Sequence, residues 1–143
     1  MLRVRVAALC VNDGRVLLAK HVRAGRVAYL LPGGGVDQGE TLVSALAREL
    51  REEAGADFEI GDLRYLIEAR SAGGERHIIQ FTFAATLQSA LGSSSDPRVE
   101  TCQWHPIADL RTLRLHPDTG TEIAADLERH ARGCRYILAA WRD

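Results

Sequence analysis

The feature that most constrains this chain is a segment of glycines and carboxylates, Gly33 to Ala56, with the sequence GGGVDQGETLVSALARELREEAGA. Three glycines open it, and Glu49, Glu52 and Glu53 lie close together near its end. Because glycine has no β-carbon, the backbone of such a turn can approach a ligand closely. Carboxylate oxygens are hard ligands that suit Mg²⁺ or Mn²⁺. The segment therefore predicts a turn and a helix that together hold a divalent metal against phosphate.

Residues Thr41 to Ala54 are predicted to form this helix, because they are rich in Ala, Leu, Glu and Arg, contain no Gly or Pro, and precede Gly55. At about 100° per residue, Glu49, Glu52 and Glu53 share one stripe of the helix surface. A second, apolar stripe lies on the order of 110° away and is expected to pack on a sheet. The apolar stripe consists of Leu42, Val43, Leu46, Ala47, Leu50 and Ala54. The alternative for the acidic stripe is a solvated face of Glu–Arg pairs.

The length, charge and cysteine content of the chain limit the classes of protein to which it can belong. Its 143 residues suit one domain, over residues 1–143, and its net charge of −1 gives no overall basic field for nucleic acid. No apolar run approaches the roughly 20 residues that a membrane span needs. Cys10, Cys102 and Cys134 are far apart and show no CxxC spacing. We therefore expect a cytoplasmic protein with reduced thiols, and with neither nucleic acid nor membrane as a partner.

Alternating apolar and polar residues predict strands over much of the remaining chain. The expected strands are residues 2–11, 15–21, 58–70, 76–87 and 98–105. The turn signal Asn12-Asp13-Gly14 joins the first two as a hairpin, whereas residues 22–27 are predicted as a loop. A second helix is predicted over residues 117–131, and the type of segment 134–142 stays open. Helices between groups of strands favour an α/β fold in which a mixed sheet packs between helices.

The joint spacing within the opening segment is far more specific than its glycines or its acids alone. It fits G-x5-E-x7-R-E-U-x-E-E-x-G-U, where U is a bulky apolar residue. The matching residues are Gly34, Glu40, Arg48, Glu49, Leu50, Glu52, Glu53 and Gly55. The seven fixed identities would coincide at a given start with a probability on the order of 10⁻⁸ to 10⁻⁹. The segment resembles the Nudix box of the Nudix hydrolases, and departs from it only at Ala56, where a larger aliphatic residue is usual. The resemblance implies an α/β/α sandwich with a central mixed β-sheet.

Nudix hydrolases cut a pyrophosphate bond in a nucleoside diphosphate linked to another group, using water and divalent metal. The resemblance therefore implies an enzyme with Mg²⁺ or Mn²⁺ as its cofactor. The implied metal ligands are the carboxylates of Glu49, Glu52 and Glu53 and the backbone carbonyl of Gly33. Arg48 is implied to orient a neighbouring glutamate through a charge-assisted hydrogen bond.

The catalytic base that would activate the water is left open at this point. Glu52 and Glu53 are candidates where the metal does not fully occupy them. Glu100 is a third candidate, because some members of the family place a loop glutamate near the metals in this region. The alternative for Glu100 is a solvent-facing acid beside Arg98.

The segment specifies phosphate chemistry and leaves the rest of the substrate open. The residues expected to contact substrate are Arg26, Tyr29, Gly34 and Gly35. One or two of a wider set of arginines are expected to meet phosphate, from Arg3, Arg5, Arg23, Arg26, Arg70 and Arg76. Tyr29 either stacks on a base or packs in the wall of the cleft. We expect a small nucleotide substrate, such as a nucleoside triphosphate, a nucleotide sugar or ADP-ribose, bound by a monomer or homodimer. The alternative function is a catalytically silent nucleotide sensor or binding module.

Overall fold

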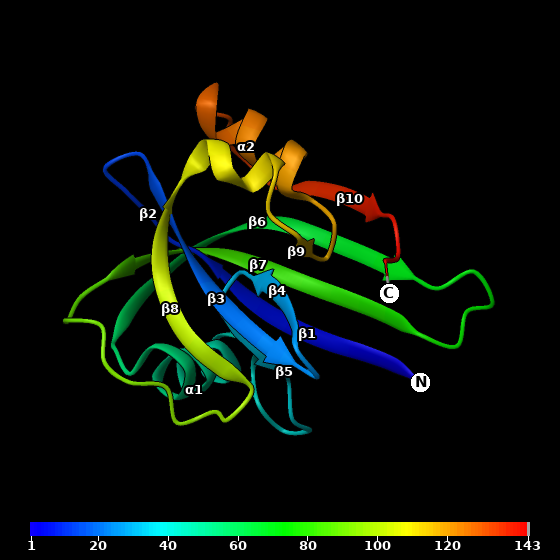
Figure 1. Cartoon of the computed structure of the whole chain (residues 1–143), viewed down its shortest axis with the longest axis horizontal. Coiled ribbons are helices and arrows are strands. Elements are labelled where there is room, and N and C mark those ends of the chain that lie inside the picture. Colours follow the sequence, from blue (N-terminus) through cyan, green and yellow to red (C-terminus); the bar gives the residue numbers. More distant parts are fainter. Residues whose placement is uncertain (143) are drawn as a thin grey trace.

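The computed structural model describes residues 1–142 and arranges their strands in two mixed sheets (Figure 1). In spatial order, the strands of the first sheet are β10 (Arg135–Ala139), β6 (Phe58–Arg70), β7 (His77–Leu87), β1 (Leu2–Leu9) and β5 (Gly33–Gly35). The second sheet contains β2 (Val11–Asn12), β3 (Arg15–Arg23), β4 (Arg26–Leu30) and β9 (Leu115–His116), with β8 (Val99–Pro106) also paired to β3. The helices are α1 (Leu42–Ala54), the 3-10 helix η1 (Ile107–Arg111) and α2 (Gly120–Glu128). The predicted α/β class with mixed strand pairing is confirmed, although the strands divide between two sheets.

Alternate residues of β1 contribute to two separate apolar cores. Val6 and Ala8 pack in the core beneath α1. Ala7 and Leu9 belong to the larger core, which is shared by both sheets and α2. Figure 1 shows α1 and α2 on opposite sides of the sheets. Because side chains alternate along a strand, Arg5 lies on the same face of β1 as Ala7, so that face changes from apolar to cationic toward the N-terminus.

Helix α1 confirms the predicted helix, with its ends set by local signals. Thr41 is the N-cap, and its side chain and that of Ser44 bond reciprocally to each other's backbone N–H groups. Gly55 follows the helix with a φ of 56°, in the left-handed region that glycine adopts most readily. No helix within residues 1–142 is both long enough and apolar enough to cross a membrane.

The predicted loop over residues 22–27 is wrong, because β3 and β4 continue through most of it as a hairpin. Arg23 and Arg26 are paired directly across the two strands, and only Ala24 and Gly25 form the turn. Their φ values of 51° and 74° match the two-residue turn that suits the twist of a hairpin. A turn of two residues leaves the arginines at the tip within the strands.

The three glycines also differ from the predicted turn, because they form the edge strand β5. Gly33, Gly34 and Gly35 pair antiparallel with Ala7, Val6 and Arg5. The absence of side chains lets β5 lie close to both β1 and α1, as described below.

Two predictions near the C-terminus are corrected or completed by the structure. Helix α2 is shorter than predicted, because Asp118 forms a β-bridge with Ala140 before the helix begins. The segment whose type stayed open contains β10, which pairs parallel with β6 at the edge of the first sheet. Of its residues, Ile137 and Ala139 face the large core.

Candidate active site

Two glutamates of α1 lie buried against the glycines of β5. Only 6% of Glu49 and 2% of Glu53 is exposed. The backbone N–H of Gly33 donates to Glu53 Oε1 at 3.3 Å. A β-carbon placed on Gly34 would lie 2.3 Å from the carboxyl carbon of Glu49. The glycines therefore create the space in which these two carboxylates are held.

This burial corrects the predicted separation of the acidic and apolar stripes of α1. Glu49 and Glu53 share the buried side of the helix with Leu46 and Leu50, whereas 48% of Val43 is exposed. The helix wheel identifies neighbours along α1 but does not show what α1 packs against. Because the facing strand is made of glycine, acidic side chains fit where larger neighbours would have excluded them.

Arg48 connects the carboxylates at the end of the site. Its Nε and Nη2 atoms each donate to one oxygen of Glu40, both at 2.8 Å. Its Nη1 atom donates to Glu49 at 3.0 Å and to Glu52 at 3.4 Å, and Nη2 also reaches the carbonyl of Gly35 at 3.1 Å. The paired bonds from Arg48, with a backbone bond from Asp37, lower the pKa of Glu40 from 4.5 to about 2. These contacts support an orienting role for Arg48 toward Glu49 and Glu52.

We predict that Glu40→Gln reduces stability at neutral pH but hardly at acid pH. The pKa of Glu40 is lower in the folded protein, so its stabilising contribution is present above about pH 4.5 and is lost as the pH falls toward about 2. Melting temperatures of the variant and the parent protein should therefore differ most near pH 7 and converge on acidification. A difference that stays constant over this range would contradict an ionic origin.

The buried carboxylates retain polar atoms that the protein does not satisfy. Glu49 Oε2, Glu53 Oε2 and His21 Nε2 are buried without a hydrogen-bond partner, and the latter two lie 3.8 Å apart. Burial raises the pKa of Glu49, because it disfavours the charged form. A buried oxygen without a hydrogen bond destabilises the folded protein. A divalent cation such as Mg²⁺ prefers hard oxygen ligands and would bind these oxygens. The donor set therefore fits the metal that the sequence predicts.

Glu52, the third predicted carboxylate ligand, does not point toward Glu49 and Glu53. Within residues 1–142, no three Asp, Glu, His or Cys side chains are arranged together as a metal-holding group. Glu52 instead faces Arg48, and 43% of its side chain is exposed. A single contact of 3.4 Å holds it there. Rotation of this exposed side chain away from Arg48 is required for Glu52 to join Glu49 and Glu53.

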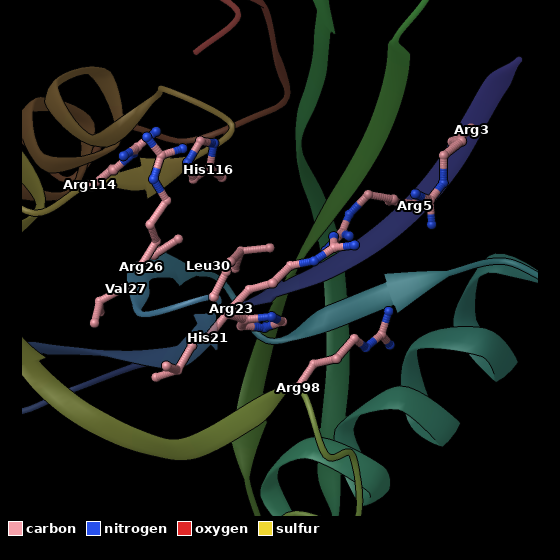
Figure 2. A pocket seen from close by; sticks show the side chains of 13 residues that line it. Arg3, Arg5, His21, Arg23, Arg26, Val27, Leu30, Arg98, Arg114 and His116 are labelled. Carbon is pink, nitrogen blue, oxygen red and sulfur yellow. The ribbon is translucent and has the colours of Figure 1, made fainter. Parts of the chain in front are cut away.

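A cationic cavity of about 540 Å³ lies beside the carboxylates. Six arginines line it, namely Arg3, Arg5, Arg23, Arg26, Arg98 and Arg114 (Figure 2). His21 also lines the cavity and faces Glu53, so it marks where the cavity meets the carboxylate site. Four of these arginines were expected from sequence, while Arg70 and Arg76 do not line this cavity. Arg98 and Arg114 were missed, because only the packing of the second sheet brings their segments to this position.

The remaining predicted site residues lie outside this cavity. Tyr29 packs against the large core and meets His105 edge-on, with ring centroids 5.4 Å apart. The side chain of Glu100 is 54% exposed, and its Oε1 atom lies 3.4 Å from Lys20 Nζ. Arg98, which the sequence placed beside Glu100, pairs with Asp96 at 2.8 Å.

Comparison with known proteins identifies the family. The family model described as the NUDIX domain matches residues 1–127. The chain belongs to the NUDIX family. The segment that resembles the Nudix box, Gly34 to Ala56, lies within the matched residues.

Several relatives resemble this NUDIX chain over most of its length. Human 8-oxo-dGDP phosphatase NUDT18 is 33% identical over 125 residues, which cover 85% of this chain and 38% of that protein. The uncharacterized Nudix hydrolase YvcI of Bacillus subtilis is 31% identical over 114 residues, covering 76% of this chain and 69% of the relative. Among solved structures, a MutT NUDIX hydrolase from Burkholderia pseudomallei has 31% identity and a TM-score of 0.73, covering 88% and 97% of the two chains. The chain thus spans little more than a third of the human relative.

Proposed function

We propose that this NUDIX chain is a divalent-metal-dependent pyrophosphohydrolase that acts on a small nucleotide, a nucleoside diphosphate linked to another group. The observation that carries the proposal is the pair of buried carboxylate oxygens without partners, on Glu49 and Glu53, beside a cavity lined by arginines. Anionic ligands for a cation on one side and cations for phosphate on the other are what a metal–pyrophosphate complex requires. Among the relatives, names that include 8-oxo-dGDP phosphatase and 8-oxo-dGTP diphosphatase support a small nucleotide, whereas an RNA pyrophosphohydrolase and a NAD-capped RNA hydrolase are named for RNA substrates.

The residues divide the work of hydrolysis between them. Glu49, Glu53 and, after rotation, Glu52 would hold Mg²⁺ or Mn²⁺, with the carbonyl of Gly33 as a further ligand. The chemistry supplied by such a cation is neutralisation of the diphosphate charge and activation of water. Arg48 keeps the carboxylates of Glu49 and Glu52 in place. The oxygen of water adds to phosphorus, its proton passes to a carboxylate, and the bridging P–O bond breaks.

Glutamine variants of Glu52 and Glu100 test which of these two residues accepts the proton from water. We predict that Glu52→Gln lowers kcat by about 100-fold or more, whereas Glu100→Gln changes it by less than about fivefold. Glu52 lies in the carboxylate group around Arg48, while Glu100 is exposed and faces Lys20. Steady-state rates over a pH series would measure both variants. A larger loss in Glu100→Gln would assign the base to β8.

We further propose that residues 1–143 act as one cytoplasmic domain on a small molecule, with neither nucleic acid nor membrane as partner. The core shared by both sheets and α2 supports one domain. The three cysteines are free, which suits a reducing compartment. Whether the domain works as a monomer or homodimer can be measured by light scattering.

One activity panel tests the proposed function against the sensor alternative. Nucleoside triphosphates, ADP-ribose, nucleotide sugars and dinucleoside polyphosphates would each be incubated with Mg²⁺ or Mn²⁺. Metal-dependent release of phosphate or a nucleoside monophosphate is the expected result. Tight nucleotide binding without turnover would overturn the proposal and favour a sensor.

A further inference from the structure

The cavity is lined by two pairs of arginines whose backbone positions are neighbours in the sheets. Arg3 and Arg5 are two residues apart on β1 and therefore lie on the same face. Arg23 and Arg26 lie directly opposite each other across the β3–β4 hairpin. Like charges in such positions destabilise a sheet. Both pairs line the same cavity, so the positive charge is concentrated there.

Within residues 1–142, no acid forms an ion pair with Arg3, Arg5, Arg23 or Arg26, although Glu49 and Glu53 act on Arg5 through their charge. The guanidinium groups of these four arginines also have no hydrogen bond with another side chain of the described residues. No Asp or Glu of this part of the chain lines the cavity. Arg98 is different, because Asp96 neutralises it. Four guanidinium groups without a hydrogen-bonded or ion-paired side chain among the described residues indicate an anionic ligand with several charges.

The rest of the lining offers a nucleobase no Phe, Tyr or Trp ring among the described residues, and its only aromatic rings are the imidazoles of His21 and His116. Apart from arginines and histidines, it consists of small or aliphatic side chains, Val22, Ala24, Val27, Ala28 and Leu30. Tyr29, the nearest such ring in sequence, packs against His105. Base recognition commonly relies on an aromatic face for stacking. The lining therefore favours recognition by charge.

The cavity extends from the carboxylate site to β9, at the edge of the second sheet. His21 lies at the near end, 3.8 Å from Glu53. Figure 2 shows Arg23 extending toward Arg5, while Arg26 extends toward Arg114 and His116. Arginines thus line the cavity from Arg5, which pairs with β5 beside the carboxylate site, to Arg114, which precedes β9.

We propose that this cavity binds one or more additional phosphate groups on the organic part of the substrate, separate from the pyrophosphate that is cleaved. The inference rests on the proposed function and narrows its substrate to a small, multiply phosphorylated pyrophosphate ester. Arg5 lies toward the cleaved diphosphate, because it is paired with Gly35 of β5 beside the carboxylate site. Arg23 and Arg26, on the hairpin, bind the additional phosphate.

Binding to the metal-free protein tests the inference without depending on catalysis. Isothermal calorimetry in EDTA would compare ADP-ribose, 2′-phospho-ADP-ribose and 5-phosphoribosyl 1-diphosphate, which carries an additional phosphate and no base. We expect 2′-phospho-ADP-ribose to bind roughly tenfold or more tightly than ADP-ribose, as a charge-assisted hydrogen bond provides, and 5-phosphoribosyl 1-diphosphate to bind at least as tightly as ADP-ribose although it lacks the base. Arg23→Gln and Arg26→Gln should each remove most of this advantage, and should weaken the binding of ADP-ribose much less than that of the additionally phosphorylated probes. Arg15→Gln is the matched control, because Arg15 is an exposed arginine at the other end of β3.

The outcomes separate this inference from the proposed function. Equal affinity with and without the additional phosphate, or equal effects of the Arg23 and Arg15 variants, would overturn the inference. Hydrolysis of all pyrophosphates at similar rates would then leave the proposed function standing. Arg23-dependent binding without metal-dependent hydrolysis would support the phosphate site and reject the hydrolase. Tighter Arg23-dependent binding of a 5′-triphosphorylated oligoribonucleotide than of the small probes would overturn the small-molecule assignment in favour of RNA.

Discussion

Glu53→Gln is expected to lower kcat by about 1,000-fold or more and to leave the fold intact. Glu53 is 2% exposed, and its Oε2 atom has no partner in the protein. Replacing this oxygen by an amide nitrogen removes a negatively charged metal ligand. The transition state then loses several kcal/mol of stabilisation, which corresponds to a rate lowered by about 1,000-fold. The amide oxygen can still accept the hydrogen bond from the N–H of Gly33. Steady-state rates with Mg²⁺ and a melting curve would measure the two effects separately.

The control for this variant is Glu59→Gln, which removes the same charge from an exposed position on β6. Glu59 contacts only the side-chain amide of Gln88, at 3.2 Å, among the residues described. Its rate should stay within about twofold of the parent protein, since surface substitutions away from a site have small effects. Activity of Glu53→Gln equal to that of Glu59→Gln in saturating Mg²⁺ would reject the metal role of Glu53. Unfolding of Glu53→Gln would contradict the retained bond to Gly33.

The parts of the fold that could be predicted from sequence are those set by local signals. Thr41 and Gly55 define the ends of α1 through capping bonds that involve only nearby residues. Strand β6 was predicted with its observed bounds because apolar and polar residues alternate near both of its ends, whereas its middle shows register shifts against β7 between Ile60 and Tyr65. The hairpin at Asp13-Gly14 followed from a turn in which both residues have positive φ. At Ala24-Gly25 the same geometry was missed, because alanine gives no signal for a positive φ.

The features of the site that escaped prediction depend on contacts between distant segments. The sequence identified Glu49 and Glu53 as a pair, but their burial depends on β5 pairing with β1 and leaving room beneath α1. The cluster of arginines was predicted in part, since Arg3 and Arg23 were singled out without any reason to place them together. Arg114 reaches the cavity because it precedes β9, which pairs parallel with β4. Parallel pairing of a two-residue strand leaves no recognisable pattern in sequence.

Alanine substitutions at the three glycines of β5 are expected to give three different results. A β-carbon at Gly33 would lie 2.0 Å from the carbonyl oxygen of Val6, which is held in the backbone of β1. Because this atom cannot move without displacing the strand, Gly33→Ala should cost several kcal/mol of unfolding free energy, beyond the range of ordinary overpacking. A β-carbon added at Gly35 would meet none of the described residues within 4 Å, so Gly35→Ala should be close to neutral and serves as the matched control.

Gly34→Ala is the informative member of the series, because its new β-carbon would meet a side chain. The nearest atoms, at 2.3 to 2.5 Å, belong to the carboxylate of Glu49, which can rotate away. We therefore expect a folded protein whose kcat falls by about 10- to 100-fold, as when the support of a metal ligand is lost. Chemical denaturation and Mg²⁺-dependent rates on the same three variants would measure this. Parent-like activity in Gly34→Ala would show that Glu49 acts from another position. Unfolding of Gly34→Ala would show that the Glu49 side chain cannot rotate away, although among the described residues only Arg48 donates a hydrogen bond to it.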